Sequence, residues 1–304
     1  MLKEYKQKHD NKIKPLLDKF SNVWSKDTKQ YNLASGILTN ETWGICCNEE
    51  EHIEKFYELV ESIFTPQSTF STSKNFFHSD LVSLINPEFR NNPIFSELCD
   101  RLYEASPQRG SGKGEILISL ICENSEKKKH KDDDICIGGK NIQMKADNAT
   151  IHQEEENDFR CVDKLNLQYF GLKQKQIVKE HKKFYPLPTF KLNGTDAREY
   201  YSKMYPKWGK SELDTIEKVW NDTQNPDTRS DELGYIVLCE YVKFKKIDSI
   251  LFTEKQKNGY IKAVHITDFT DKKFILDNIK FKPQKTRGGS TQACPDGLVN
   301  VSIK

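Results

Sequence analysis

The sequence predicts a mixed α/β protein, in which helices surround a β-hairpin and further strands lie near the C-terminus. Apolar residues recur at helical spacing in several segments before residue 221. Residues 134–145, D-I-C-I-G-G-K-N-I-Q-M-K, alternate apolar and polar residues on both sides of Gly138-Gly139, which predicts a tight hairpin. Short apolar runs after Gly234 predict additional strands.

The N-terminal segment, residues 1–25, is rich in lysine and has an amphipathic pattern. Its apolar stripe consists of Ile13, Leu16, Leu17 and Phe20. Such a stripe predicts a helix packed on the body of the protein rather than one that binds a partner. Residues 31–47 are predicted as a loop and a short strand. Asn48 and the glutamates after it begin a second amphipathic helix, residues 49–63.

The middle of the chain leads into a short apolar helix. A Ser/Thr-rich loop, a short apolar segment and a helix near residues 94–103 come first. The run G-S-G-K-G then precedes a helix that starts at Glu115. A phosphate-binding Walker loop needs glycine and Ser/Thr where this chain has Pro107 and Gly114, so that interpretation is set aside.

The hairpin gathers polar side chains at one end. Because successive strand residues face opposite sides, Gln143 and Lys145 share one face, opposite Ile142 and Met144. Asp134, at the mouth of the first arm, is expected beside them across the ladder. The helix that carries Glu115 is near enough in sequence to supply a second carboxylate.

The C-terminal half is predicted as helices followed by strands. Residues 160–183 predict two helices separated at Gly171, residues 184–208 an ordered loop, and residues 211–220 a helix capped by Ser211. The apolar run 235–242, Y-I-V-L-C-E-Y-V, predicts a strand buried on both faces. Later strands are expected at 249–253, 260–266, 278–282 and 298–303.

Composition limits the function classes. The chain is 36% hydrophobic and 30% charged, which predicts a globular core with a heavily solvated surface. A net charge of +2 gives no global attraction for polyanions, so a nucleic-acid surface requires local clustering of charge. Residues 241–290 provide such clustering, with eleven Lys and one Arg against five acids.

The cellular setting follows from cysteines and hydropathy. The eight cysteines are scattered without a C-x-x-C motif, which predicts reduced core residues and no structural zinc site. With no apolar run long enough for a membrane span and no secretory signal, we expect a cytoplasmic protein without a membrane partner.

The segment from Glu115 to Lys145 resembles the PD-(D/E)XK nuclease superfamily, which has the restriction-endonuclease-like fold. In that family an aspartate opens one strand, and an acidic residue and a lysine, one residue apart, lie on the next. A glutamate on the preceding helix often completes the site. This chain departs from the pattern at Asp133, where the family has proline, and at Gln143, which replaces the glutamate of the E-x-K element.

The resemblance implies a central mixed sheet flanked by helices and a site that uses Mg²⁺ or Mn²⁺. Asp134, Glu115 and Gln143 would be the metal ligands, because oxygen donors suit Mg²⁺. Together with Lys145 they would form the catalytic set. Lys145 would orient or polarise the attacking water, or stabilise the pentavalent phosphate.

Double-stranded DNA is the expected partner, and a homodimer would suit cutting both strands. Residues 126–134, E-K-K-K-H-K-D-D-D, are either a solvated linker or a basic finger that touches phosphate. Residues 285–294 are either a plain exposed loop or a phosphate-binding one. The candidate DNA contacts are Lys113, Lys127, Lys128, Lys129, Lys285 and Arg287.

The expected organisation has three regions. Residues 1–85 form an N-terminal helical region packed on the body, 86–242 a nuclease-like core, and 243–304 a basic, β-rich C-terminal extension. Three functions stay open: a Mg²⁺-dependent DNA endonuclease, a catalytically weakened DNA-binding or structural module, and a protein assembly component. The Lys- and Asn-rich composition indicates an AT-rich viral, for example phage, or mobile-element gene.

Overall fold

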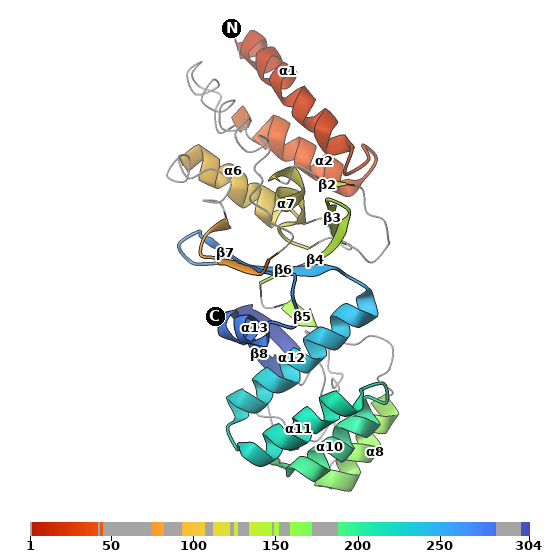
Figure 1. Ribbon diagram of the computed structural model, residues 1–304. Helices are drawn as coiled ribbons and strands as arrows, with labels where there is room; N and C mark the ends of the chain where they lie inside the picture. The colour runs from red at the N-terminus through yellow and green to blue at the C-terminus, as the bar shows by residue number, and fades with distance from the viewer. Residues whose placement is uncertain are drawn as a thin grey trace. The chain divides into compact units, whose positions relative to one another are not determined.

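The computed structural model places the chain in two compact units (Figure 1). Unit 1 comprises Met1–Asp147 and Ile247–Asp268, and unit 2 comprises Asn148–Lys246 and Phe269–Lys304. The structure describes residues 2–41, 43–44, 74–81, 93–106, 112–121, 125–126, 134–147, 149–151, 159–171, 188–283 and 299–304. Helices and sheets occur in both units, so the predicted mixed α/β class is confirmed.

Unit 1 is built on a mixed sheet with the strand order β1-β7-β6-β4-β3-β2 among the residues described. Strands β4 and β6 are parallel, and the other neighbouring pairs are antiparallel. The hairpin and the strands expected at 249–253 and 260–266 are therefore confirmed. The strands are β1 (Phe76–His78), β2 (Ser125–Glu126), β3 (Ile135–Ile137), β4 (Lys140–Ala146), β6 (Ser249–Lys255) and β7 (Ile261–Ile266).

Helices cover one face of this sheet. Ile142 and Met144 of β4 belong to the same buried cluster as the apolar side chains of α6 and α7. Ile13 and Phe20 of α1 join that cluster, so α1 packs against the other helices of unit 1. The helices of unit 1 are α1 (Leu2–Ser21), α2 (Lys29–Gly36), η1 (Ile37–Glu41, a π-helix), α6 (Pro93–Glu104) and α7 (Glu115–Ile121).

The prediction of a loop and a strand for residues 31–47 is wrong over its described part. Thr28 accepts a hydrogen bond from the Tyr31 N–H and so caps α2, which continues into η1. Tertiary burial of Ala34 and Leu38 stabilises this helix, although its sequence has only a weak amphipathic pattern. The helix predicted for residues 49–63 lies outside the described residues.

Unit 2 combines a group of helices with a small antiparallel sheet of order β5-β9-β8. The strands predicted at 278–282 and 298–303 are confirmed as β8 and β9. The helices are α8 (Phe159–Phe170), η3 (Pro188–Lys191, a 3-10 helix), α10 (Gly194–Met204), α11 (Lys210–Asp222), α12 (Pro226–Lys245) and α13 (Lys272–Asn278). The strands are β5 (Ala149–Ile151), β8 (Ile279–Pro283) and β9 (Val299–Ile303).

The predicted strand at 235–242 is wrong, because these residues lie in the middle of α12. Asn225 accepts hydrogen bonds from the backbone N–H groups of Asp227 and Thr228, and Pro226 occupies the first helical position. The apolar run is continuous because this helix is buried on several sides. Periodicity alone cannot distinguish such a helix from a buried strand.

Two further predictions in unit 2 need correction. Residues 184–208 were expected to form a loop, but their described part contains η3 and α10. Asn193 caps α10 by accepting from the Asp196 N–H. Helix α11 begins at Lys210, and Gly209 rather than Ser211 occupies its N-cap. Helix α8 ends at Phe170, directly before the predicted break at Gly171, which has φ of 66°. The helix predicted after Gly171 lies outside the described residues.

A buried arginine joins the elements of the helical part of unit 2. The Arg229 side chain is 0% exposed and donates from Nε to the carbonyl oxygen of Thr223 at 2.7 Å. Its terminal nitrogens donate to the carbonyl oxygens of Phe190 and Trp220. Burial lowers the pKa of Arg229. The carbonyls at the C-terminal end of α11 stabilise the buried charge in place of a carboxylate.

The segment predicted as a C-terminal extension is divided between the units. Strands β6 and β7 complete the sheet of unit 1, whereas α13, β8 and β9 belong to unit 2. Among the described residues, Cys99, Cys136 and Cys239 form no disulfide, and the first two are buried. No helix in the described ranges is long and apolar enough to cross a membrane.

Candidate functional site

The hairpin of β3 and β4 supplies the centre of the candidate site. Its turn consists of Gly138 and Gly139, whose φ values of 55° and 77° are left-handed and favour glycine. Ile135 pairs with Ile142, so the residue before β3 lies opposite the residue after Ile142. This register places Asp134 opposite Gln143.

Asp134 and Gln143 are in direct contact. The Asp134 Oδ2 atom accepts a hydrogen bond from the Met144 backbone N–H at 2.8 Å and another from Nε2 of Gln143. The Gln143 side chain is only 6% exposed. The predicted approach of Asp134 to the second arm is therefore confirmed, and two N–H donors stabilise its carboxylate.

Lys145 lies on the same face of β4 as Gln143. The opposite face of the strand carries Met144, whose terminal carbon lies near Gly114 at the start of α7. Gly114 has φ of 84° and packs under the Tyr103 ring, and a Cβ there would lie 3.2 Å from Met144. Lys145 is half-buried and pairs in the parallel ladder with Phe252 of β6.

Glu115 comes from the layer of helices that packs on the Met144 side of the sheet. It is the first residue of α7 and is 1% exposed. Its Oε1 atom accepts a hydrogen bond from the Gly112 N–H, which closes the turn before the helix. A hydrogen bond thus joins Asp134 with Gln143, whereas Glu115 lies in the helical layer on the Met144 side of β4, and its role as a ligand stays a prediction.

Two side chains at the hairpin carry oxygen atoms of the kind that bind a hard divalent cation. Asp134 provides a carboxylate, and Gln143 can provide its amide oxygen if the amide rotates by about half a turn, because its NH₂ group now faces Asp134. Within the described ranges, no three His, Cys, Asp or Glu side chains gather as a metal-binding group. At position 143 the amide offers a neutral oxygen, whereas a glutamate there would add a second negative charge to the site.

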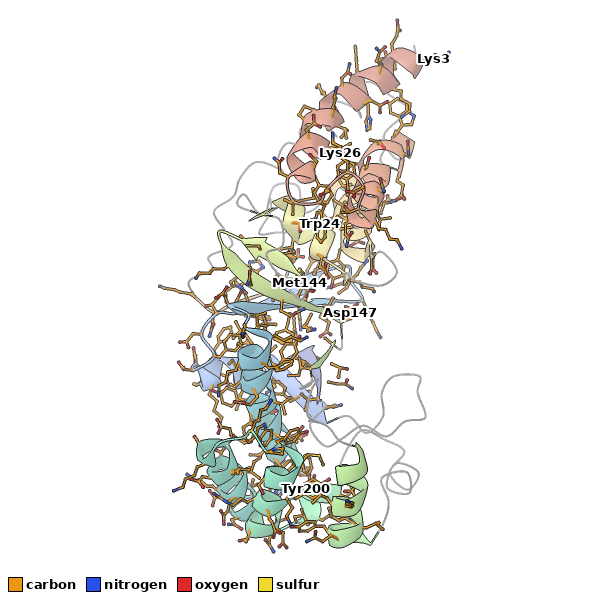
Figure 2. All side chains as sticks on the ribbon, turned by 90° about the vertical axis from the view of Figure 1, so that its right-hand side faces the viewer. Lys3, Trp24, Lys26, Met144, Asp147 and Tyr200 are labelled. Carbon is orange, nitrogen blue, oxygen red and sulfur yellow. The ribbon has the colours of Figure 1, made fainter. Side chains whose placement is uncertain are left out.

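A cluster of charges at the end of β4 was not anticipated from the sequence. Lys113, predicted to contact DNA, has its Nζ atom 2.8 Å from Glu104 and 3.1 Å from Asp147. Hydrogen bonds to these two carboxylates raise the pKa of Lys113, and the bond to Glu104 has the larger effect. Asp147 also accepts from the Lys255 N–H at 3.2 Å. Figure 2 labels Met144 and Asp147, which lie three positions apart where β4 ends.

A sequence signal for this cluster existed. Asp147, a residue type that favours turns, comes directly after β4 and has φ of 40°. The other predicted DNA contacts, Lys127, Lys128, Lys129, Lys285 and Arg287, lie outside the described residues.

Comparison with known proteins gives no relative of this chain. No family model matches it, and no curated protein or solved structure is significantly similar to it.

Proposed function

We propose that this protein is a metal-dependent DNA endonuclease that hydrolyses phosphodiester bonds and resembles PD-(D/E)XK enzymes. One observation carries the proposal: the hairpin register places Asp134 opposite Gln143, with Lys145 on the same face of β4 as Gln143. A central mixed sheet with helices against it, in which the aspartate precedes β3 and the lysine lies on β4, agrees with the expected fold.

Each residue has a role that its position permits. Asp134 is held by two N–H donors, so its carboxylate is fixed at the mouth of the hairpin. Gln143 orients that carboxylate and offers an amide oxygen after rotation. Lys145 carries a positive charge that can hold a scissile phosphate or the attacking water. A bound Mg²⁺ would supply Lewis acidity and lower the pKa of a bound water.

A second candidate is a weakened nuclease that binds DNA without cutting it efficiently. The Gln143–Asp134 hydrogen bond favours this alternative, because the amide satisfies the carboxylate without a cation. In a site with two carboxylates, a cation would be needed to relieve their repulsion.

Nicking of supercoiled plasmid with Mg²⁺, Mn²⁺ or EDTA tests the two candidates. Wild type should nick only with metal, and Lys145→Ala should lower the rate on the order of 100-fold or more, as loss of a charge-stabilising group does. Lys140→Ala is the matched control, since Lys140 lies on the same strand at its exposed end. It should leave the rate unchanged.

The outcomes separate the candidates. Metal-dependent nicking lost in Lys145→Ala alone supports the endonuclease. DNA binding without nicking by wild type supports the weakened nuclease. Wild type that neither nicks nor binds DNA contradicts both.

A further inference from the structure

The small sheet of unit 2 has one apolar and one polar face. Phe281 of β8 and Val301 of β9 pair directly and are each 2% exposed. Ser230 of α12 donates to the Phe281 carbonyl oxygen at 2.7 Å, so α12 packs on this side. The alternate residues form what we call the polar sheet face: Thr150, Lys280, Lys282, Asn300 and Ser302.

The polar sheet face carries positive charge without internal compensation. Lys280 and Lys282 are exposed, and neither has an ion pair in the described part of the chain. None of the residues of this face is acidic. Two lysines of the preceding helix α13, in contrast, do form ion pairs: Lys272 pairs with Glu232 at 2.5 Å, and Lys273 also pairs with a carboxylate. The two uncompensated ammonium groups come from positions about 7 Å apart along the strand.

The neutral members of the face add hydrogen-bond donors. The Thr150 hydroxyl donates to Oδ1 of Asn300 at 2.9 Å. This bond occupies the amide oxygen of Asn300, so the NH₂ group is the part left to donate outward. Ser302 contributes a hydroxyl opposite Lys280. Ammonium, amide and hydroxyl donors on one surface are the groups that bind phosphate oxygens.

We propose that the polar sheet face of unit 2 binds the phosphate backbone of duplex DNA. The choice of DNA as the polyanion rests on the proposed function. The surface contacts phosphates rather than bases, so it contributes affinity and salt dependence and is indifferent to DNA sequence.

The test compares three double variants with wild type on a fluorescent DNA duplex in EDTA, where cleavage does not contribute. Lys280→Gln/Lys282→Gln removes both charges from the face, and Lys280→Arg/Lys282→Arg preserves them. The matched control is Lys210→Gln/Lys218→Gln, which neutralises two exposed lysines of α11 with no ion pair in the described residues. Thermal unfolding checks that each variant is folded.

Loss of two phosphate contacts should make the slope of log K against log salt shallower by about 2. The same relation gives binding on the order of 50-fold weaker at about 0.1 M salt. The arginine variant and the α11 control should bind as wild type does. Plasmid nicking by wild type is measured separately.

Each outcome decides one of the two proposals. If the glutamine variant of the face binds as tightly as the α11 control, the face does not hold DNA, whether or not wild type nicks plasmid. If binding weakens only in that variant and wild type does not nick, the face is established and the endonuclease proposal fails. If wild type does not bind duplex DNA, or prefers anionic lipid vesicles, the inference is overturned.

Discussion

The contact between Asp134 and Gln143 predicts an unusual response to Gln143→Glu. Wild type places an amide N–H against the Asp134 carboxylate in a site where residue 143 is 6% exposed. The substitution replaces this donor with a second carboxylate of nearly the same shape. It therefore exchanges an attraction for a repulsion without changing the packing volume.

The expected loss of stability in Gln143→Glu follows from this geometry. A hydrogen bond to a charged group contributes about 1.5–3 kcal/mol, which is lost. Two unit charges at about 3 Å repel by about 5 kcal/mol at an effective dielectric constant of 20, and protonation of one carboxyl limits that cost. We expect the free energy of unfolding at neutral pH to fall by about 3–5 kcal/mol in EDTA.

A divalent cation should reverse this loss. Urea unfolding in EDTA and in Mg²⁺ measures the effect, because binding at 100 times the dissociation constant returns about 2.7 kcal/mol. Wild type should respond less to Mg²⁺ than the variant does. The double variant Asp134→Asn/Gln143→Glu restores one amide and one carboxylate, and it should regain stability in EDTA.

One result would refute this reasoning. If Gln143→Glu is as stable as wild type in EDTA and gains nothing from Mg²⁺, the two side chains are not in contact in solution. The assignment of the hairpin as the metal site would then lose its main support.

Three further predictions concern the stability of the fold. Burial lowers the pKa of His265 to about 4, below the unfolded value of about 6.5. The contribution of the neutral His265 to the free energy of unfolding is therefore complete above about pH 6.5, and up to about 3 kcal/mol of it is lost as the pH falls to about 4. Urea unfolding at about pH 7 and about pH 4 should show this loss in wild type but not in His265→Gln. Arg229→Met removes the hydrogen bonds to three backbone carbonyls, two of them buried, and should lower the free energy of unfolding by about 3 kcal/mol or more; an unchanged denaturation midpoint would contradict this expectation. Gly234→Ala would bring a Cβ within 2.2 Å of Phe281 and should cost about 1–3 kcal/mol in thermal unfolding, whereas Gly36→Ala, with open space around it, should be neutral or stabilising.

Local chemistry determined several elements that the sequence alone could predict. The Gly-Gly turn, the alternation of Ile142 and Met144 with Gln143 and Lys145, and the resulting position of Asp134 all follow from a period of two and a turn that needs positive φ. The amphipathic N-terminal helix and the late strands follow equally from periodicity.

Only the tertiary structure decided what surrounds these elements. Residues 235–242 lie in α12, and the burial of this helix on several sides removes the periodic signal that separates a helix from a strand. The parallel pairing of β4 with β6 joins residues about a hundred positions apart, and local sequence contains no information on such a contact.

The same distinction applies to the candidate site, because one part of it could be predicted from the sequence and another part depends on tertiary packing. Asp134 and Gln143 were predictable because they lie only nine positions apart in one hairpin, whose register is fixed by the turn. Two other features depend on how distant segments pack. One is the pairing of Lys113 with Glu104 and Asp147, and the other is the polar sheet face, which combines β5 with β8 and β9. The sequence therefore determined the chemistry of each strand, and the fold decided which strands and helices share a surface, because that choice depends on burial summed over the whole chain.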